Sequence, residues 1–274
     1  MTDGRNSPDR PLATRVVTAL ALGGAATAGV LLLPTAAVAV LLGAFVLAGS
    51  WEWARFAQYG PHARGIYVVA PGSLMLLAFP GVAAYFDAAL VLALAGWLLA
   101  ALGLAVWPRP LPATAIAALG VAALFPGWLL LTHIHGAGPR GPWLAFTGLA
   151  LVAAADIGAY FVGRAIGRTK LAPRISPGKT WEGVAGGVGL AAATALLAGY
   201  TLALPLPVFL ATAVATAAAS VIGDLTVSML KRNVGAKDSG SLLPGHGGVM
   251  DRIDGLTAAV PVYALGLELG GLIG

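Results

Sequence analysis

Charged residues are rare in this sequence, but several gather between residues 220 and 255. Asp224 is followed at helical spacing by Ser228, Lys231 and Arg232, so one helix would direct a carboxylate, a hydroxyl and two cations toward a common space. If that helix crosses a bilayer, a lone aspartate costs about 2.5–3.5 kcal/mol at the centre. An ion pair within the helix is the simpler explanation. Because ionisable groups inside membranes mark functional sites by default, we interpret this group as part of one.

A glycine-rich polar stretch follows, from residue 233 to residue 250. It contains Lys237, Asp238, His246, Gly247 and Gly248. Glycines allow backbone N–H groups to approach phosphate oxygens closely. A connection of this length without evident secondary structure is usually functional or disordered rather than a plain linker. We therefore predict that this stretch contributes to a phosphate site.

Asp251 and Asp254 lie three residues apart at the predicted start of the last helix, so they face the same way. Carboxylates also suit a helix N-terminus for purely structural reasons. Brought together with Asp224, they would form an oxygen-rich site of the kind that Mg²⁺ prefers beside substrate phosphates. Neighbouring cations would hold the phosphates: Lys231, Arg232, Lys237 and Arg252. This combination indicates metal-assisted phosphoryl or nucleotidyl transfer.

A second cluster runs from residue 176 to residue 183. Ser176 and Pro177 predict a helix start, and Lys179 beside a helix N-terminus could bind an anion. The Gly-Lys-Thr run is not a P-loop, because Pro173 occupies the position of the first glycine and we expect no strand before it. From spacing alone, helix capping and substrate binding remain equally open.

Other polar residues are more isolated. Asp156 would either approach the same polar centre or bond a neighbouring helix. Glu52 lies between Trp51 and Trp53 at the end of an apolar segment, which favours a role as an interfacial anchor. Four residues are expected to be solvated on the outer side: Asp87, His133, His135 and Arg140.

Composition identifies the setting of these groups. Of 274 residues, 58% are hydrophobic and 10% charged, whereas soluble domains carry about 25% charged residues. The chain is therefore predicted to be an integral membrane protein. Its net charge of +5 fits the basic cytoplasmic loops of membrane proteins, so we expect no nucleic-acid partner. With no cysteine, disulfides and thiolate metal sites are excluded.

The apolar segments predict an all-α, polytopic membrane protein with about nine transmembrane helices. They fall at residues 16–33, 36–54, 66–86, 88–107, 112–132, 143–163, 183–204, 207–230 and 254–273. Pro71 and Pro80 interrupt the third segment. Small residues at four-residue spacing (Gly183, Gly187 and Ala191) predict close contact with another helix. We divide the chain into a cytoplasmic tail (1–14), N-terminal transmembrane helices (15–140) and a C-terminal catalytic region (141–274).

The distribution of Lys and Arg residues predicts the orientation of the chain in the membrane. With nine spans and a cytoplasmic N-terminus, Arg140 is the only Lys or Arg residue left outside, as the positive-inside rule predicts. Both polar clusters would then face the cytoplasm. The first apolar segment, followed at once by others, is read as a retained span rather than a signal peptide.

The C-terminal motifs resemble those of a known family. S-x-x-K-R, K-D and H-G-G-x-x-D-R-x-D, between Ser228 and Asp254, resemble the signature of the phosphatidate cytidylyltransferases (CDP-diacylglycerol synthases) without a departure. S-P-x-K-T-x-E-G at residues 176–183 and D-x-G-A-Y at residues 156–160 are similar to that family too. In the N-terminal half, the likeness extends to hydropathy and the pair Glu52 and Trp53. Asp-Gly at residues 254–255 also occurs in CDP-alcohol phosphotransferases, but the Ala-Arg expected after it is absent.

The resemblance implies an enzyme that converts CTP and phosphatidate into CDP-diacylglycerol and pyrophosphate at a bacterial inner (plasma) membrane. Its expected partners are these two substrates and membrane lipids, and a homodimer is the assembly considered. It implies Mg²⁺ held by Asp224 and Asp251, with K⁺ as an additional cation. The implied catalytic residues are Asp224, Asp251, Asp254, Lys231 and Arg232. The implied substrate-binding residues are Ser176, Lys179, Thr180, Glu182, Ser228, Lys237, Asp238, His246, Gly247, Gly248 and Arg252.

Three alternatives are weighed against this hypothesis. A related membrane CTP transferase could act on another lipid phosphate, such as an archaeal-type ether lipid, and the signature does not separate the two. A transporter could use Asp156 and Asp224 as a relay, but the outer segments are short and nearly uncharged. A structural scaffold would not explain why acidic, basic and glycine residues coincide in two cytoplasmic loops.

Overall fold

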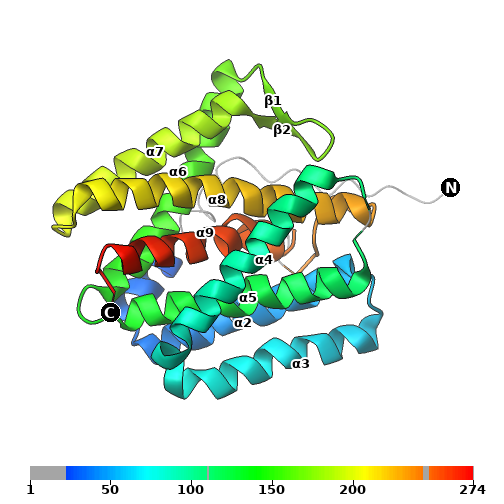
Figure 1. Ribbon diagram of the computed structural model, residues 1–274, viewed down its shortest axis with the longest axis horizontal. Helices are drawn as coiled ribbons and strands as arrows, with labels where there is room; N and C mark the ends of the chain where they lie inside the picture. The colour runs from blue at the N-terminus through cyan, green and yellow to red at the C-terminus, as the bar shows by residue number, and fades with distance from the viewer. Residues whose placement is uncertain (1–22, 110, 243–246, 274) are drawn as a thin grey trace.

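The computed structural model describes residues 23–109, 111–242 and 247–273 (Figure 1). A helical stretch at residues 23–32 comes first. The elements that follow are α2 (Thr35–Phe56), α3 (Pro61–Ala78), the 3-10 segment η1 (Phe79–Tyr85), α4 (Phe86–Val106), α5 (Ala113–Gly136), α6 (Gly141–Ile166), β1 (Lys170–Ala172), β2 (Ser176–Thr180), α7 (Trp181–Thr201), α8 (Leu206–Asn233) and α9 (Met250–Leu269). The predicted all-α class is confirmed, with one short hairpin added.

Six helical segments of the described residues are long and apolar enough to cross a membrane. One of them, residues 61–106, contains both α3 and α4, which meet at a bend around η1 (Figure 1). Gly81, directly after Pro80, leaves helical geometry there (φ −130°, ψ 36°), whereas Pro71 stays inside α3. α9 is not one of the six, and it carries charged residues near both ends: Asp251, Arg252 and Asp254 at its start and Glu268 near its end. The nine-span count therefore stays a prediction.

Successive helices alternate in direction, and this brings several connections to one end of the bundle. α2, α4 and α8 end on the right in Figure 1, where α3, α5 and α9 begin. Basic residues lie in the helix turns next to these connections, or in the connections themselves: Arg55, Arg64, Arg109, Lys231 and Arg232. We call this the cationic end of the bundle. The connection between α8 and α9, residues 234–249, is the longest of the three connections there.

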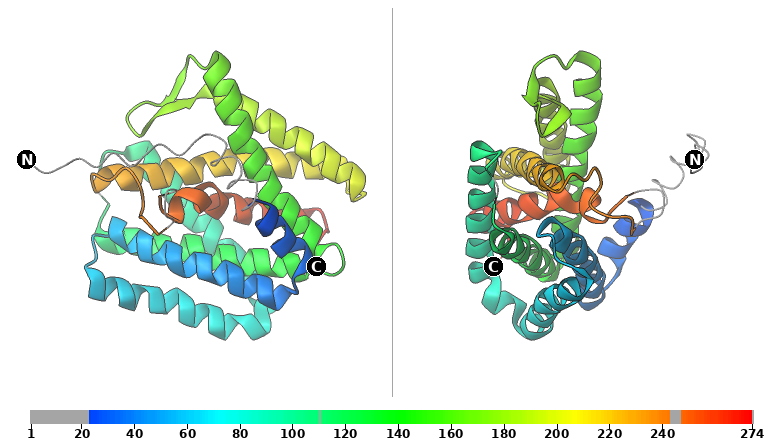
Figure 2. Two further views of the ribbon diagram at one scale, coloured as in Figure 1. Left: turned by 180° about the vertical axis from the view of Figure 1, so that it is seen from behind. Right: turned by 90° about the vertical axis from the view of Figure 1, so that its right-hand side faces the viewer.

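α6 and α7 rise from the rest of the molecule and carry the hairpin at their tip (Figure 2). They touch through their backbones: a β-carbon on Gly158 would collide with Gly186 O, and one on Gly187 with Ala155 O. Small residues permit this approach between membrane helices. The close contact predicted for the Gly183, Gly187 and Ala191 face is confirmed.

The predicted helix start at Ser176 and Pro177 is wrong. Residues Ser176–Thr180 form β2, which pairs antiparallel with β1. Proline is tolerated because both strands of a two-stranded sheet are edges. α7 instead begins at Trp181, where Thr180 Oγ1 accepts a hydrogen bond from Gly183 N–H at 3.1 Å and acts as the N-cap. A strand does precede the Gly-Lys-Thr run, contrary to expectation, but Pro173 still excludes a P-loop.

His135 was expected to be solvated and is buried, with 2% of its surface exposed. Its Nε2 lies 2.8 Å from Val30 O, and its Nδ1 lies 3.0 Å from Thr35 Oγ1. Because both ring nitrogens have partners, the imidazole can be buried at low cost. The histidine thus joins α5 to the start of α2.

Candidate active site

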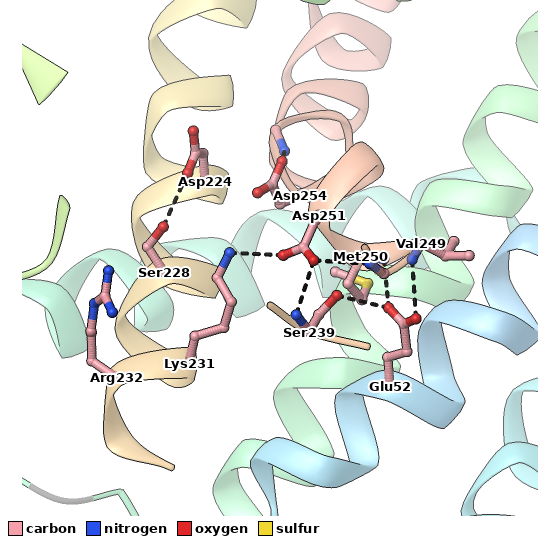
Figure 3. Close-up of polar contacts among 12 residues, drawn as sticks. Glu52, Asp224, Ser228, Lys231, Arg232, Ser239, Val249, Met250, Asp251 and Asp254 are labelled. Atoms are coloured by element: carbon pink, nitrogen blue, oxygen red, sulfur yellow. Dashed lines mark hydrogen bonds and ion pairs between the residues drawn. The ribbon is translucent and has the colours of Figure 1, made fainter. Parts of the chain in front are cut away.

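α8 and α9 pack side by side and present their polar residues to each other (Figure 3). Their backbones come closest where a β-carbon on Gly223 would collide with Asp254 O. From α8, Ser228 Oγ donates to Asp224 Oδ1 at 3.2 Å, and Lys231 Nζ lies 2.8 Å from Asp251 Oδ1 on α9. The spacing correctly predicts that these α8 side chains share a face.

Arg232 leaves that face. Its Nε donates to Ile175 O, in the turn of the hairpin, at 3.3 Å. The side chain therefore connects the end of α8 to the hairpin instead of lying next to Lys231 (Figure 3).

Asp251 is the most heavily bonded carboxylate of the cluster. Its Oδ1 accepts from Lys231, and its Oδ2 accepts from the backbone N–H groups of Ser239 (2.9 Å) and Gly248 (3.1 Å). Burial by itself raises the pKa of this carboxyl, but the three hydrogen bonds outweigh burial and hold the pKa below its ordinary value. Asp251 is therefore an anion at neutral pH that joins α8, α9 and the connecting loop.

Asp254 lies one turn further along α9, between Asp224 and Asp251 in the view of Figure 3. Its Oδ1 accepts a hydrogen bond from Gly255 N–H at 2.8 Å. The structure thus brings together the three aspartates that the sequence singles out, at the meeting point of α8 and α9.

The glycines of the signature have steric reasons for being glycines. Gly247 has φ +82°, in the left-handed region. A β-carbon on Gly248 would collide with Ser239 Oγ and would lie 2.5 Å from Glu52 Oε2. Lys237 and Asp238 are exposed on the same loop. His246 lies outside the described residues.

The second sequence cluster joins the first through an ion pair. Lys179, at the end of β2, pairs with Asp224 Oδ2. A cavity of about 500 Å³ lies between α6, α7, α8 and the hairpin. Its polar lining is Asp156, Tyr160, Arg164, Lys179, Thr180, Ser220 and Asp224. Asp156, whose role the sequence left open, therefore approaches the same polar centre.

Three predicted substrate-binding residues lie away from this centre. Glu182 is half-buried and accepts hydrogen bonds from the N–H groups of Arg168 (3.2 Å) and Thr169 (3.1 Å), so it fastens the base of the hairpin. Ser176 lies at the start of β2, outside the lining of the cavity. Arg252 lines an apolar groove between α2, α5 and α9.

Glu52 is not an interfacial anchor. It is 1% exposed, and its carboxylate accepts hydrogen bonds from Ser239 Oγ (2.8 Å), Val249 N–H (3.1 Å) and Met250 N–H (2.9 Å). The sequence interpretation weighed the flanking tryptophans and overlooked that a buried carboxylate requires donors. Ser239, also buried, was not predicted as a site residue.

The donor set fits a hard cation that also binds substrate. Among the residues that the structure describes, no three acidic, histidine or cysteine side chains converge closely enough to hold a metal ion alone. Mg²⁺ usually takes one or two carboxylates and completes its shell with phosphates and water. Asp224, Asp254 and Asp251 supply carboxylates where α8 meets α9, and Lys179 and Lys231 supply cations for phosphates. Asp224 and Lys179 also line the cavity.

Fold and site together define a helical membrane protein with an acid–base centre suited to phosphate chemistry. The Cytidylyltransferase family matches residues 13–269. A phosphatidate cytidylyltransferase of Pseudomonas aeruginosa is 41% identical over 260 residues, covering 92% of this chain and 96% of the relative. One of Haemophilus influenzae is 38% identical over 280 residues (92% and 97%), and one of Bacillus subtilis is 43% identical over 119 residues (42% and 44%). The chain belongs to the cytidylyltransferase family.

Proposed function

We propose that the protein is a phosphatidate cytidylyltransferase, which converts CTP and phosphatidate into CDP-diacylglycerol and pyrophosphate. The observation that carries this proposal is the 41% identity over 92% of the chain with a relative of that name. The cluster of Asp224, Asp251, Lys179 and Lys231 supports it, because the cluster offers both carboxylates and cations, and Asp224 and Lys179 line one cavity.

The reaction forms a bond from a phosphate oxygen of phosphatidate to the α-phosphorus of CTP, and it breaks the bond to the departing pyrophosphate. A phosphate monoester is already an anion near neutral pH, so no strong general base is required of this chain. What the protein must supply is alignment of the two phosphates and compensation of their negative charge.

Carboxylates and lysines divide this work. Asp224 and Asp251, with Asp254 between them, would hold Mg²⁺, and K⁺ is a candidate second cation. When bound, Mg²⁺ would offset negative charge on the phosphates. Lys179 and Lys231 each pair with one of the two carboxylates. Because Lys179 borders the space for substrate, it can exchange its carboxylate partner for a phosphate.

The cavity between α6, α7 and α8 is the proposed CTP site. Its volume of about 500 Å³ lies in the range of small-molecule pockets. Tyr160, Arg164 and Lys179 in its lining offer an aromatic ring and two cations to a nucleotide. The acyl chains of phosphatidate would stay in the bilayer, so the two substrates would meet at the edge of the membrane.

We further propose nine spans, a cytoplasmic N-terminus and a site that faces the cytoplasm of a bacterial inner membrane. Support comes from the arginines and lysines at or next to the connections between α2 and α3, α4 and α5, and α8 and α9, which the positive-inside rule assigns to the cytoplasm. Tags at either terminus, probed for accessibility in intact cells, test this topology. A homodimer in membrane lipids is a separate proposal, which crosslinking in the membrane tests.

The direct test is incubation of the purified protein with labelled CTP, phosphatidate and Mg²⁺. The expected product is a labelled liponucleotide, formed only when both substrates and the metal are present. A panel of lipid phosphates, ether lipids included, separates phosphatidate from the alternative substrates. A folded protein that forms no liponucleotide with any of these lipids would contradict the proposal.

A further inference from the structure

Ser239 connects α2 and α9 through three different atoms. Its backbone N–H donates to Asp251 Oδ2 at 2.9 Å, and its Oγ donates to Glu52 Oε2 at 2.8 Å. Its carbonyl oxygen accepts a hydrogen bond from Arg55 Nη1 at 2.9 Å. The last turn of α2, with Glu52 and Arg55, therefore holds the loop residue that in turn holds Asp251.

Glu52 also holds the other end of the same loop. Its two oxygens accept the N–H groups of Val249 and Met250, at the start of α9. These amides belong to the unsatisfied donors that every helix N-terminus carries, and residue 249 makes no side-chain cap of its own. A carboxylate at this end also suits the helix dipole. One α2 side chain thus closes the loop at residue 239 and at residue 249.

The packing around this carboxylate leaves little freedom. Glu52 and Ser239 are each 1% exposed. A β-carbon on Gly240 would collide with the Glu52 carboxylate, and one on Gly248 would lie 2.5 Å from its Oε2. Residues 239–240 and 248–250 therefore lie directly against Glu52, as Figure 3 shows for Ser239, Val249 and Met250.

We infer that Glu52 is a positioning residue for the reaction. It sets the location of the Asp251 carboxylate by fixing Ser239 and the first turn of α9, and through Asp251 it also sets Lys231. This inference rests on the proposed function as far as the reaction is concerned. The geometric part, that Glu52 orders the amides which bind Asp251, holds whatever the substrate is.

Glu52→Gln tests both parts. Glutamine keeps the shape but loses the charge, and it turns one acceptor into a donor that faces the donors of Ser239, Val249 or Met250. The expected result is a fall in kcat of about 10- to 100-fold, as for other residues that orient a functional group without touching the substrate. The KM values change less, because the cytosine base and the acyl chains do not contact the loop in this proposal.

Hydrogen exchange is the readout that does not depend on activity. The amides of Val249 and Met250 lose a direct partner in Glu52→Gln, so their faster exchange is expected in any case. The decisive amides are those of Ser239 and Gly248, which donate to Asp251. If Glu52 orders the loop, their exchange also accelerates. Glu268→Gln, at the exposed far end of α9, is the matched control and changes neither measurement.

A double variant separates positioning from general stability. Ser239→Ala removes only the link from Oγ to Glu52, so we expect a smaller loss of kcat in the same direction. Because both residues act through one chain of contacts, Glu52→Gln with Ser239→Ala should lose no more than Glu52→Gln alone. If Glu52→Gln does not fold, the effects of Ser239→Ala on kcat and on Gly248 exchange decide the question.

Two results would overturn the inference. One is a folded Glu52→Gln protein with unchanged exchange at Ser239 and Gly248. The other is a double variant whose fold-loss of kcat equals the product of the fold-losses in Glu52→Gln and Ser239→Ala. A wild-type protein that makes no CDP-diacylglycerol would instead contradict the proposed function, and the exchange data would still test whether Glu52 orders the loop.

Discussion

The two halves of the site differ in how firmly they are built. On the α8–α9 side, Asp251 accepts three hydrogen bonds and is backed by Ser239 and Glu52, and the side chains of the Lys231–Asp251 pair are 14% and 13% exposed. On the hairpin side, Lys179 meets Asp224 in an open cavity, with 26% and 28% of the two side chains exposed. The first half is fixed before substrate arrives, and the second can adjust to it.

This difference assigns the halves to different tasks. Aligning two phosphates demands groups that do not move, and a displacement of about 1 Å can cost 100-fold in rate. Admitting and releasing a nucleotide demands the opposite. We therefore expect substitutions on the α8–α9 side to lower kcat and substitutions on the hairpin side to raise the KM for CTP.

The largest effect is expected from Asp251→Asn. The amide cannot carry the charge that pairs with Lys231, and one of its two acceptor positions becomes a donor. Turnover should fall to background while the protein stays folded in detergent, as judged by product formation and thermal unfolding. Asp87→Asn, in the first turn of α4, is the matched control. Wild-type activity in Asp251→Asn would refute the proposed metal and positioning roles.

Gly248→Ala should come next. The new methyl group would press on Ser239 Oγ and the Glu52 carboxylate, so the loop must shift, at a cost of about 1–3 kcal/mol in stability. We expect a loss of about 100-fold in kcat from the displaced loop. Gly189→Ala, which has open space around it in α7, provides the comparison in both assays. Equal behaviour of the two variants would show that the α8–α9 half is not rigid.

Lys179→Ala should act on the other half. Loss of a charged hydrogen bond costs about 1.5–3 kcal/mol, so the KM for CTP should rise by about 10-fold or more while kcat changes less. Lys170→Ala, on the neighbouring strand, controls for the loss of a positive charge. Because Thr180 supplies the helix cap, an unchanged KM would leave Lys179 without a role in nucleotide binding.

The smallest effect concerns pH. Asp251, in the first turn of α9, has a lowered pKa, whereas an unfolded aspartate titrates near 3.9. Its contribution to stability is therefore complete above about pH 5 and is lost as the pH falls through the lowered value. The difference in unfolding temperature between wild type and Asp251→Asn should be constant at neutral pH and shrink in acid. A difference that already shrinks near neutral pH would contradict the lowered pKa.

The sequence was informative where function depends on short spacing. Asp224, Ser228 and Lys231 share a helix face, so helical periodicity alone predicts that they act together. Asp251 and Asp254 follow from the same rule. The apolar composition predicts the helical class, and the glycines of α7 predict its close contact with α6.

The sequence was less informative where a polar side chain forms hydrogen bonds with backbone groups that are far away in the sequence. Glu52 and Met250 are 198 residues apart, and nothing in the pattern Trp-Glu-Trp identifies backbone amides as partners. Ser239 looks like any loop serine until the helices are assembled. The hairpin was missed because Ser-Pro at residues 176–177 is equally compatible with a helix start and an edge strand. A charged residue next to Trp53 at the end of an apolar segment was the available signal for Glu52.

The hydrogen bonds between Glu52 of α2 and the start of α9 have a consequence for biosynthesis of the enzyme. Because α2 and α9 must meet before Asp251 is held, ribosomes must finish nearly the whole polypeptide before any copy can be competent. A fragment that begins after residue 140 would retain the recognisable signature yet lack Glu52. Chimeras between relatives would, for the same reason, have to exchange the two segments together.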